Sequence, residues 1–194
     1  MRWLRIGAMA GLAGAIIFSI LWTAAVQQDG DWAFGENTLS ELADTARPGR
    51  DLFNAGVIMA ALLWIPFALA IMRCLPRGPF AKAGSVLFLT SAFALLAIGI
   101  FPIDTGAPHT VASWTFFVVA MVSLLLMAKP IGDSEVFGRI GMLPTVIAPV
   151  LSLTLLMLTS VPLAEAVAVI CLMVWAAIIS ILIVVNYTLM VRRS

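Results

Sequence analysis

The run from Ile6 to Val26 reads IGAMAGLAGAIIFSILWTAAV and contains no charged residue. As an α-helix it would be about 31 Å long, which matches a hydrocarbon core of about 30 Å. Its last part, Thr23-Ala24-Ala25, has the small residues of a weak signal-peptide cleavage site. Because the whole run is long enough to span a bilayer, we expect it to be a retained first transmembrane helix.

Five further apolar runs follow, and together they dominate the composition. Hydrophobic residues make up 62% of the 194-residue chain and charged residues 11%, whereas soluble domains contain about 45–50% and about 25%. Inside hydrocarbon every backbone N–H and C=O must be paired within its own segment, so each run is expected to be a helix. We predict an all-α integral membrane protein, with one six-helix membrane domain over residues 1–194. The predicted helices cover about residues 6–26, 52–72, 81–101, 110–128, 140–160 and 163–190.

The basic residues predict the orientation of this bundle. Of the 11 Lys and Arg residues, nine flank helix ends that share one side, and only Arg47 and Arg50 belong to the other side. Cytoplasmic loops carry the excess of Lys and Arg, so both termini are predicted to be cytoplasmic in a multi-pass protein of the plasma membrane. The nine residues are Arg2, Arg5, Arg73, Arg77, Lys82, Lys129, Arg139, Arg192 and Arg193.

The composition also excludes several classes of protein. The net charge is +1 and the basic residues form no patch, so no nucleic-acid partner is expected. Cys74 and Cys171 cannot build a disulfide framework. The short connections leave no room for a soluble catalytic domain. Gly7, Gly11 and Gly14 form a small-residue face that permits close approach of another helix, either of the same chain or of a second copy.

The long first connection, residues 27–50, contains the first group of candidate site residues. Thr38 and Glu41 have the spacing of a capping box, which predicts a short helix over about 39–46. Ser40 and Asp44 are four residues apart and would share a face of that helix. Asp44 is the residue of most interest here, because capping does not account for it.

The second group surrounds the connection at residues 101–109, which ends in the only histidine of the chain, His109. Asp44, Asn54, Asp104 and His109, with Glu41 and Glu165, are predicted to lie at one level in the outer third of the membrane. Ionisable groups at that depth are unfavourable unless paired, which favours an Asp104–His109 hydrogen bond. Such a cluster could be purely structural and lock the two loops together, or it could bind a ligand or act in catalysis. For Glu165 the favourable position of an acid in a first helical turn is an equally good explanation.

The same residues limit the cofactors. One histidine cannot supply bis-histidine haem ligation or a histidine-rich zinc site, so neither haem nor zinc is expected. A carboxylate site could hold Mg²⁺ or Ca²⁺, but the spacing does not fix a ligand set, and no metal site is assigned. A phosphate-binding glycine loop and a nucleophile elbow are both absent from the sequence.

Short motifs in residues 27–128 resemble the domain-of-unknown-function 998 family of six-helix prokaryotic membrane proteins. They are residues 37–42 (NTLSEL), residues 51–56 (DLFNAG), and residues 99–102 (GIFP) with the downstream His109. Two positions depart from the pattern: Glu41, where the family often has Asp, and Ala43, where Gly is common. The layout is more distantly similar to damage-regulated autophagy modulator type proteins. The resemblance supplies no reaction, and implies that the positions to test are Asn37, Ser40, Glu41, Asn54, Pro102 and His109.

Three hypotheses for function remain open at this point. The polar cluster binds a lipid headgroup or small polar ligand; the chain is an accessory subunit of a larger membrane complex or homo-oligomer; or it modifies lipids, with His109 as general base oriented by Asp104. A proton-coupled transporter is the weakest alternative, because no acid is predicted at mid-membrane depth. Membrane lipids are the expected partners in the first case, with Asn37, Ser40, Glu41, Asp44, Asn54, Asp104 and His109 as ligand-binding candidates.

Overall fold

The computed structural model describes residues 2–193, with side chains through residue 186, and it is all-helical. Six α-helices are long and apolar enough to cross a membrane, which confirms the predicted fold class. Two short 3₁₀ helices lie in the connections. The elements are α1 (Arg2–Asp29), η1 (Leu39–Ala43), α2 (Arg50–Cys74), α3 (Pro79–Ile100), η2 (Ile103–Thr105), α4 (Ala107–Asp133), α5 (Gly138–Leu158) and α6 (Val161–Arg193).

Most helices extend beyond their apolar runs. The largest difference is in α4, which was predicted to end at residue 128 and continues through Pro130 to Asp133. Lys129 and Asp133 form an ion pair four residues apart on this extension, an arrangement that supports a helix outside the hydrocarbon. Hydrophobicity therefore located the helices but not their polar ends.

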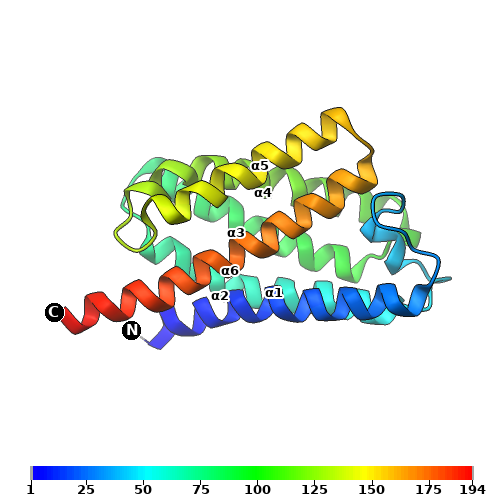
Figure 1. The fold of residues 1–194 in the computed structure, drawn as a ribbon, viewed down its shortest axis with the longest axis horizontal. Helices are drawn as coiled ribbons and strands as arrows, with labels where there is room; N and C mark the ends of the chain where they lie inside the picture. Colours follow the sequence, from blue (N-terminus) through cyan, green and yellow to red (C-terminus); the bar gives the residue numbers. More distant parts are fainter. Residues whose placement is uncertain (1, 194) are drawn as a thin grey trace.

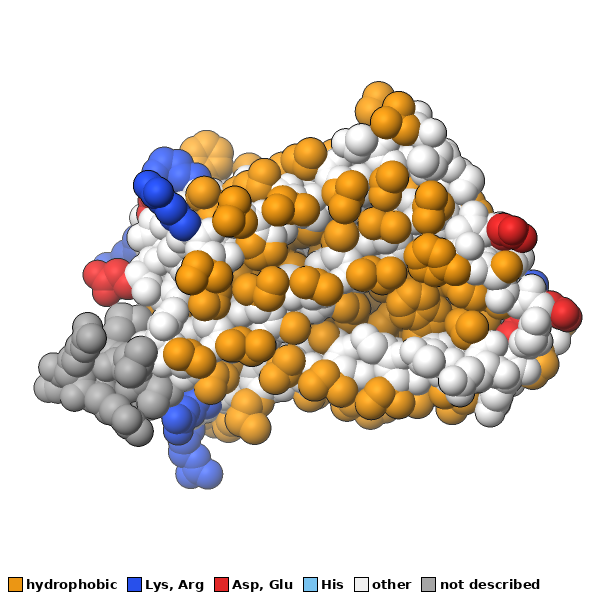
Figure 2. Space-filling model, viewed as in Figure 1, with side chains coloured by type: hydrophobic (Ala, Val, Ile, Leu, Met, Phe, Trp, Pro, Cys, Tyr) orange, Lys and Arg blue, Asp and Glu red, His pale blue; other side chains and the backbone are white. Residues whose placement is uncertain are grey.

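The helices form an up-and-down ring in which each packs on the next and α6 closes against α1 (Figure 1). Both termini lie at one end of this ring, here called the terminal end. Residues 30–49, η2 and the α5–α6 turn lie at the other, here called the loop end. Basic side chains gather at the terminal end, with acidic ones among them, and acidic side chains predominate at the loop end (Figure 2). The orientation of these ends in a membrane stays a prediction, and the side chains of Arg192 and Arg193 lie outside the described residues.

Four aromatic side chains fill the centre of the ring, and they are here called the aromatic cluster: Trp64, Phe67, Phe88 and Trp175. All four are at most 1% exposed, and the ring centroids of Phe88 and Trp175 are 5.0 Å apart. The Trp175 indole N–H donates to the Thr145 hydroxyl over 2.8 Å. The cluster thereby joins α2, α3, α5 and α6 near mid-bundle.

The glycine face of α1 packs inside the chain. A Cβ atom on Gly7 would lie 2.6 Å from the carbonyl oxygen of Pro66, and one on Gly11 would lie 2.5 Å from the Phe67 ring. Only glycine permits this approach between α1 and α2. The partner of this face is therefore α2 of the same chain.

Candidate functional site

A pocket lies between the loop end and the aromatic cluster, and η1 covers part of it. Its cavity volume is about 40 Å³. Three of its lining residues are polar: Ser40, Ser113 and Glu165. Ala60 and Leu172 also line it and lie about one helical turn before Trp64 and Trp175, so the aromatic cluster lies about one turn beyond the pocket. The other lining residues are Phe18, Leu39, Phe53, Val57, Leu95, Ile98, Phe116, Phe117, Val169 and Met173.

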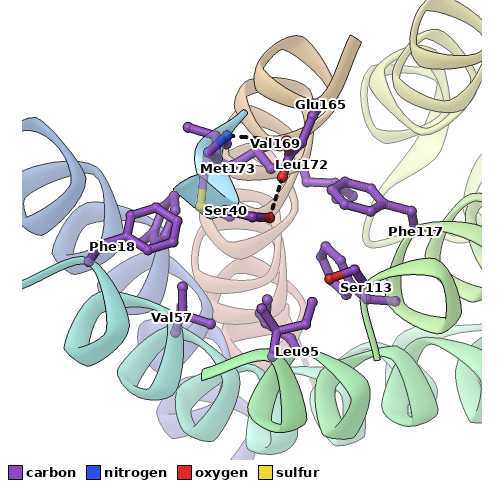
Figure 3. A pocket seen from close by; sticks show the side chains of 15 residues that line it. Phe18, Ser40, Val57, Leu95, Ser113, Phe117, Glu165, Val169, Leu172 and Met173 are labelled. Atoms are coloured by element: carbon purple, nitrogen blue, oxygen red, sulfur yellow. Dashed lines mark hydrogen bonds between the residues drawn. The ribbon is translucent and has the colours of Figure 1, made fainter. Parts of the chain in front are cut away.

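Glu165 holds η1 over this pocket. The Ser40 hydroxyl donates to Glu165 Oε1 over 3.0 Å, and the Leu39 backbone N–H donates to Oε2 over 3.1 Å. Figure 3 shows the carboxylate reaching from the start of α6 to η1, with Ser113 on the facing wall of the pocket. These two bonds, here called the Glu165 latch, connect residues more than 120 positions apart.

Glu41 organises the turn that leads into η1. Its Oε1 accepts from both the backbone N–H and the hydroxyl of Thr38, each over 3.0 Å, and its Oε2 accepts from the Asn37 amide over 2.7 Å. The predicted capping box is confirmed, although the helix is a 3₁₀ helix over Leu39–Ala43 and not a helix over 39–46. Partial burial raises the pKa of the Glu41 carboxyl, but the bonds from Thr38 and Asn37 and the charge of Arg47 outweigh it and lower that pKa overall.

An ion pair ties the same loop to the end of α1. Arg47 Nη1 lies 2.7 Å from Asp29 Oδ1, and the Asp29 side chain is 0% exposed. Arg47 Nη2 also lies 3.8 Å from Glu41 Oε2. Arg47 was expected only to indicate the orientation of the bundle, and its pair with Asp29 was not predicted because 18 residues separate the partners.

His109 is buried in the first turn of α4, and both of its ring nitrogens are hydrogen-bonded. Nδ1 lies 2.8 Å from the carbonyl oxygen of Phe101, and Nε2 lies 3.2 Å from the Ser113 hydroxyl. Because a carbonyl only accepts, Nδ1 carries the hydrogen, and Nε2 of the neutral ring accepts from Ser113. The predicted Asp104–His109 hydrogen bond is wrong: Asp104 is exposed on η2, and other groups occupy the ring.

The remaining predicted site residues lie apart from the pocket. Asp44 Oδ1 accepts from the backbone N–H of Ala46 over 2.8 Å, a local turn that accounts for it. Ser40 and Asp44 do not share a face, because a 3₁₀ helix has three residues per turn and η1 ends at Ala43. Asn54 is half-buried and makes no hydrogen bond among the described side chains. The expected single cluster is therefore divided between the loop and the pocket.

Two pocket residues were missed or undervalued by sequence reasoning. Ser113 follows His109 by four residues, a spacing that places both on one helix face and could have identified it. Glu165 was explained by the helix dipole, and no local pattern relates it to Ser40. Among residues with described side chains, no group of three His, Cys, Asp or Glu could hold a metal ion.

The family comparison extends the resemblance noted in the motifs. The family described as "Protein of unknown function (DUF998)" matches residues 12–182. The chain belongs to this family. Within the DUF998 match lie α5 and most of α6, beyond the 27–128 segment that carries the motifs. No curated protein and no solved structure matches the chain. Since DUF998 proteins have no assigned function, any function has to be argued from the pocket itself.

Proposed function

We propose that this DUF998 protein is a multi-pass protein of the cell membrane that binds an amphiphilic molecule in the pocket below η1. The supporting observation is the distribution of its lining. Ser40, Ser113 and Glu165 are polar, and the other twelve lining residues are apolar. Ligand sites typically combine an apolar wall with a few placed polar groups. The ligand's chain would contact the apolar wall, and its polar group would bind Glu165 and the two hydroxyls.

The size of the pocket limits what it holds while η1 is in place. A volume of about 40 Å³ holds about three water molecules, since one needs about 10–15 Å³. A chain segment fits, whereas a larger ligand requires η1 to move and the Glu165 latch to open. Figure 2 shows a hollow floored by hydrophobic side chains between the loop-end parts of α1 and α6. Because both helices line the pocket, this hollow offers a lateral route from the bilayer.

Filling the pocket tests the proposal. Ala60 is 1% exposed and lines the pocket, so Ala60→Phe should occupy the ligand's space. Ala55, on the same helix, is exposed, and Ala55→Phe is the matched control. We expect native mass spectrometry to detect one bound single-chain amphiphile per wild-type and Ala55→Phe chain, and at least tenfold weaker binding to Ala60→Phe. Equal binding by all three proteins would overturn the proposal.

The His109–Ser113 pair favours a second candidate function, lipid acyl hydrolysis. A hydroxyl bonded to a histidine whose other nitrogen is fixed by a third group is the arrangement that activates serine nucleophiles. Ser113 Oγ would attack an ester carbonyl carbon while its proton passes to His109 Nε2. The departing alcohol would take that proton, and water would then hydrolyse the acyl-serine. The Phe101 carbonyl, and not Asp104, would orient the histidine.

A fluorophosphonate probe tests this second candidate, because it reacts with activated serines. Wild-type protein should be labelled at Ser113, and Ser113→Ala should lose the label. Ser19→Ala is the control, since the Ser19 hydroxyl donates to the backbone carbonyl of Ala15 on α1 and has no histidine beside it to activate it. Absence of labelling in the wild type, or equal labelling of Ser113→Ala, would exclude Ser113 as the nucleophile and leave the binding proposal untouched.

A further inference from the structure

The charges in the pocket indicate what kind of polar group it accepts. Among its lining residues, Glu165 is the one with an acidic side chain, and no Lys or Arg is present in the lining. An anionic headgroup would therefore meet a carboxylate of like charge with no cation to offset it. A neutral or cationic headgroup would not be repelled by this carboxylate.

Glu165 itself has no cationic partner among the described residues. The groups that bond it, the Ser40 hydroxyl and the Leu39 N–H, are both neutral. Glu41, on the same 3₁₀ helix as Ser40, is also acidic, and Arg47 is engaged by Asp29 and Glu41. A carboxylate withdrawn from water is unfavourable unless a counter-charge compensates it. Each Glu165 oxygen accepts one bond and has capacity for another.

The apolar part of the lining is suited to a cation as well as to an alkyl chain. Four phenylalanine rings line the pocket: Phe18, Phe53, Phe116 and Phe117. Phe18 on α1 and Phe53 on α2 have ring centroids 5.9 Å apart, and Phe116 and Phe117, consecutive residues of α4, have ring centroids 5.0 Å apart. Ring faces attract ammonium groups, so a positive headgroup beside these rings would be favoured while its chain contacts the aliphatic residues.

We propose that the ligand of this pocket carries an ammonium group that binds the Glu165 carboxylate. This inference rests on the proposed binding function and specifies its ligand class: an ammonium attached to an apolar chain. When the ligand enters, its N–H groups replace the Ser40 and Leu39 donors, so the carboxylate keeps its hydrogen bonds and gains a counter-charge. The Glu165 latch therefore opens in the same step in which the ligand binds the carboxylate.

Three ligands with the same twelve-carbon chain test the inference: dodecylammonium, dodecanol and laurate, titrated in maltoside micelles. Wild-type protein should bind dodecylammonium at least about tenfold more tightly than dodecanol, equivalent to about 1.4 kcal/mol, and laurate most weakly. Glu165→Gln should reduce the ratio of ammonium to alcohol affinity to near one. Since micelle partitioning is the same for both proteins, a change in that ratio reports on the pocket.

Glu36→Gln is the matched control, because Glu36 is exposed at the same loop end, within residues 30–49, and its replacement changes the net charge equally. It should keep the ammonium preference. If Glu165→Gln does not fold, the order of affinities of the three ligands for the wild-type protein still tests the inference. Equal binding of all three, blocked by Ala60→Phe, would overturn the ammonium inference and leave the proposed function standing. Binding of none would overturn both.

A fourth ligand distinguishes the source of the ammonium group. Lysophosphatidylethanolamine carries it next to a phosphate, as a bilayer lipid would, whereas dodecylammonium represents a free long-chain amine. Binding of the lysolipid that is weakened at least tenfold by Glu165→Gln would assign the site to a bilayer lipid. Binding of the free amine alone would assign it to single-chain amines. Laurate as the preferred ligand would contradict the inference in either form.

Discussion

The centre of the bundle and its loop end are held together by different interactions. At the centre, the aromatic cluster fills the ring, and a glycine lets α1 contact it: a Cβ on Gly11 would lie 2.5 Å from the Phe67 ring. At the loop end, η1 lies over a pocket and is held by the Glu165 latch. Packing leaves no space for a ligand, whereas a few hydrogen bonds can be exchanged for bonds to one. The site is therefore expected where packing is incomplete.

The largest expected effect breaks the central packing. Trp175→Ala removes a fully buried ring that contacts Phe67 and Phe88 and leaves the Thr145 hydroxyl without its donor. We expect a loss of about 3–5 kcal/mol in unfolding free energy, as for other buried aromatic truncations. Trp114 is 61% exposed, and Trp114→Ala should change little. Denaturant titration in micelles, followed by circular dichroism, measures the unfolding free energy of both variants. Similar losses in the two variants would contradict the assignment of the aromatic cluster as the packed centre of the bundle.

The next largest effect concerns the Arg47–Asp29 ion pair, and it tests whether one interaction at the loop end contributes strongly to stability. Arg47→Ala leaves the Asp29 carboxylate buried without its partner, and breaking such pairs loses about 3–5 kcal/mol. Since Arg47 is 25% exposed, we expect the lower part of that range. Adding Asp29→Asn should restore part of the loss, because the uncompensated charge is gone. A double variant no more stable than Arg47→Ala would contradict this explanation in the same denaturant titration.

The Glu165 latch should contribute less to stability and more to access. Glu165→Ala leaves the Leu39 N–H and the Ser40 hydroxyl without an acceptor. We expect it to lower the free energy of unfolding by about 1–3 kcal/mol. Glu165→Gln retains an acceptor oxygen and should lose less. Limited proteolysis of residues 30–49 reports the opening of η1, and cleavage should be fastest for Glu165→Ala. Asp104→Ala, at an exposed position on the same end, should match the wild type; faster cleavage there would indicate general loosening of this end.

The same contrast explains what could be predicted from sequence. Hydrophobic runs such as residues 6–26 predicted the six helices, because the length of a spanning helix and the pairing of its backbone are local requirements. The Thr38–Glu41 capping box was predicted for the same reason. The Ser40–Glu165 and Arg47–Asp29 contacts depend on how distant segments meet, which spacing does not encode. The predicted Asp104–His109 hydrogen bond is absent because Nδ1 of His109 bonds the backbone carbonyl of Phe101. Every residue has such a carbonyl, so no sequence pattern indicates which one a histidine will bond.

The smallest expected effect concerns Glu41 and sharpens the loop-end side of the comparison. Its pKa is lowered in the folded chain, and an unperturbed glutamate titrates at about 4.3. The folded state therefore binds the proton more weakly than the unfolded state. The stabilisation by Glu41 is fully present above about pH 4.3 and is lost as the pH falls through the lower folded-state pKa.

Glu41→Gln should be less stable than the wild type at pH 7, and the difference in stability should shrink on acidification. Melting temperatures of both proteins between pH 7 and pH 3 provide the measurement. A difference independent of pH would mean that Glu41 acts through its shape and not its charge.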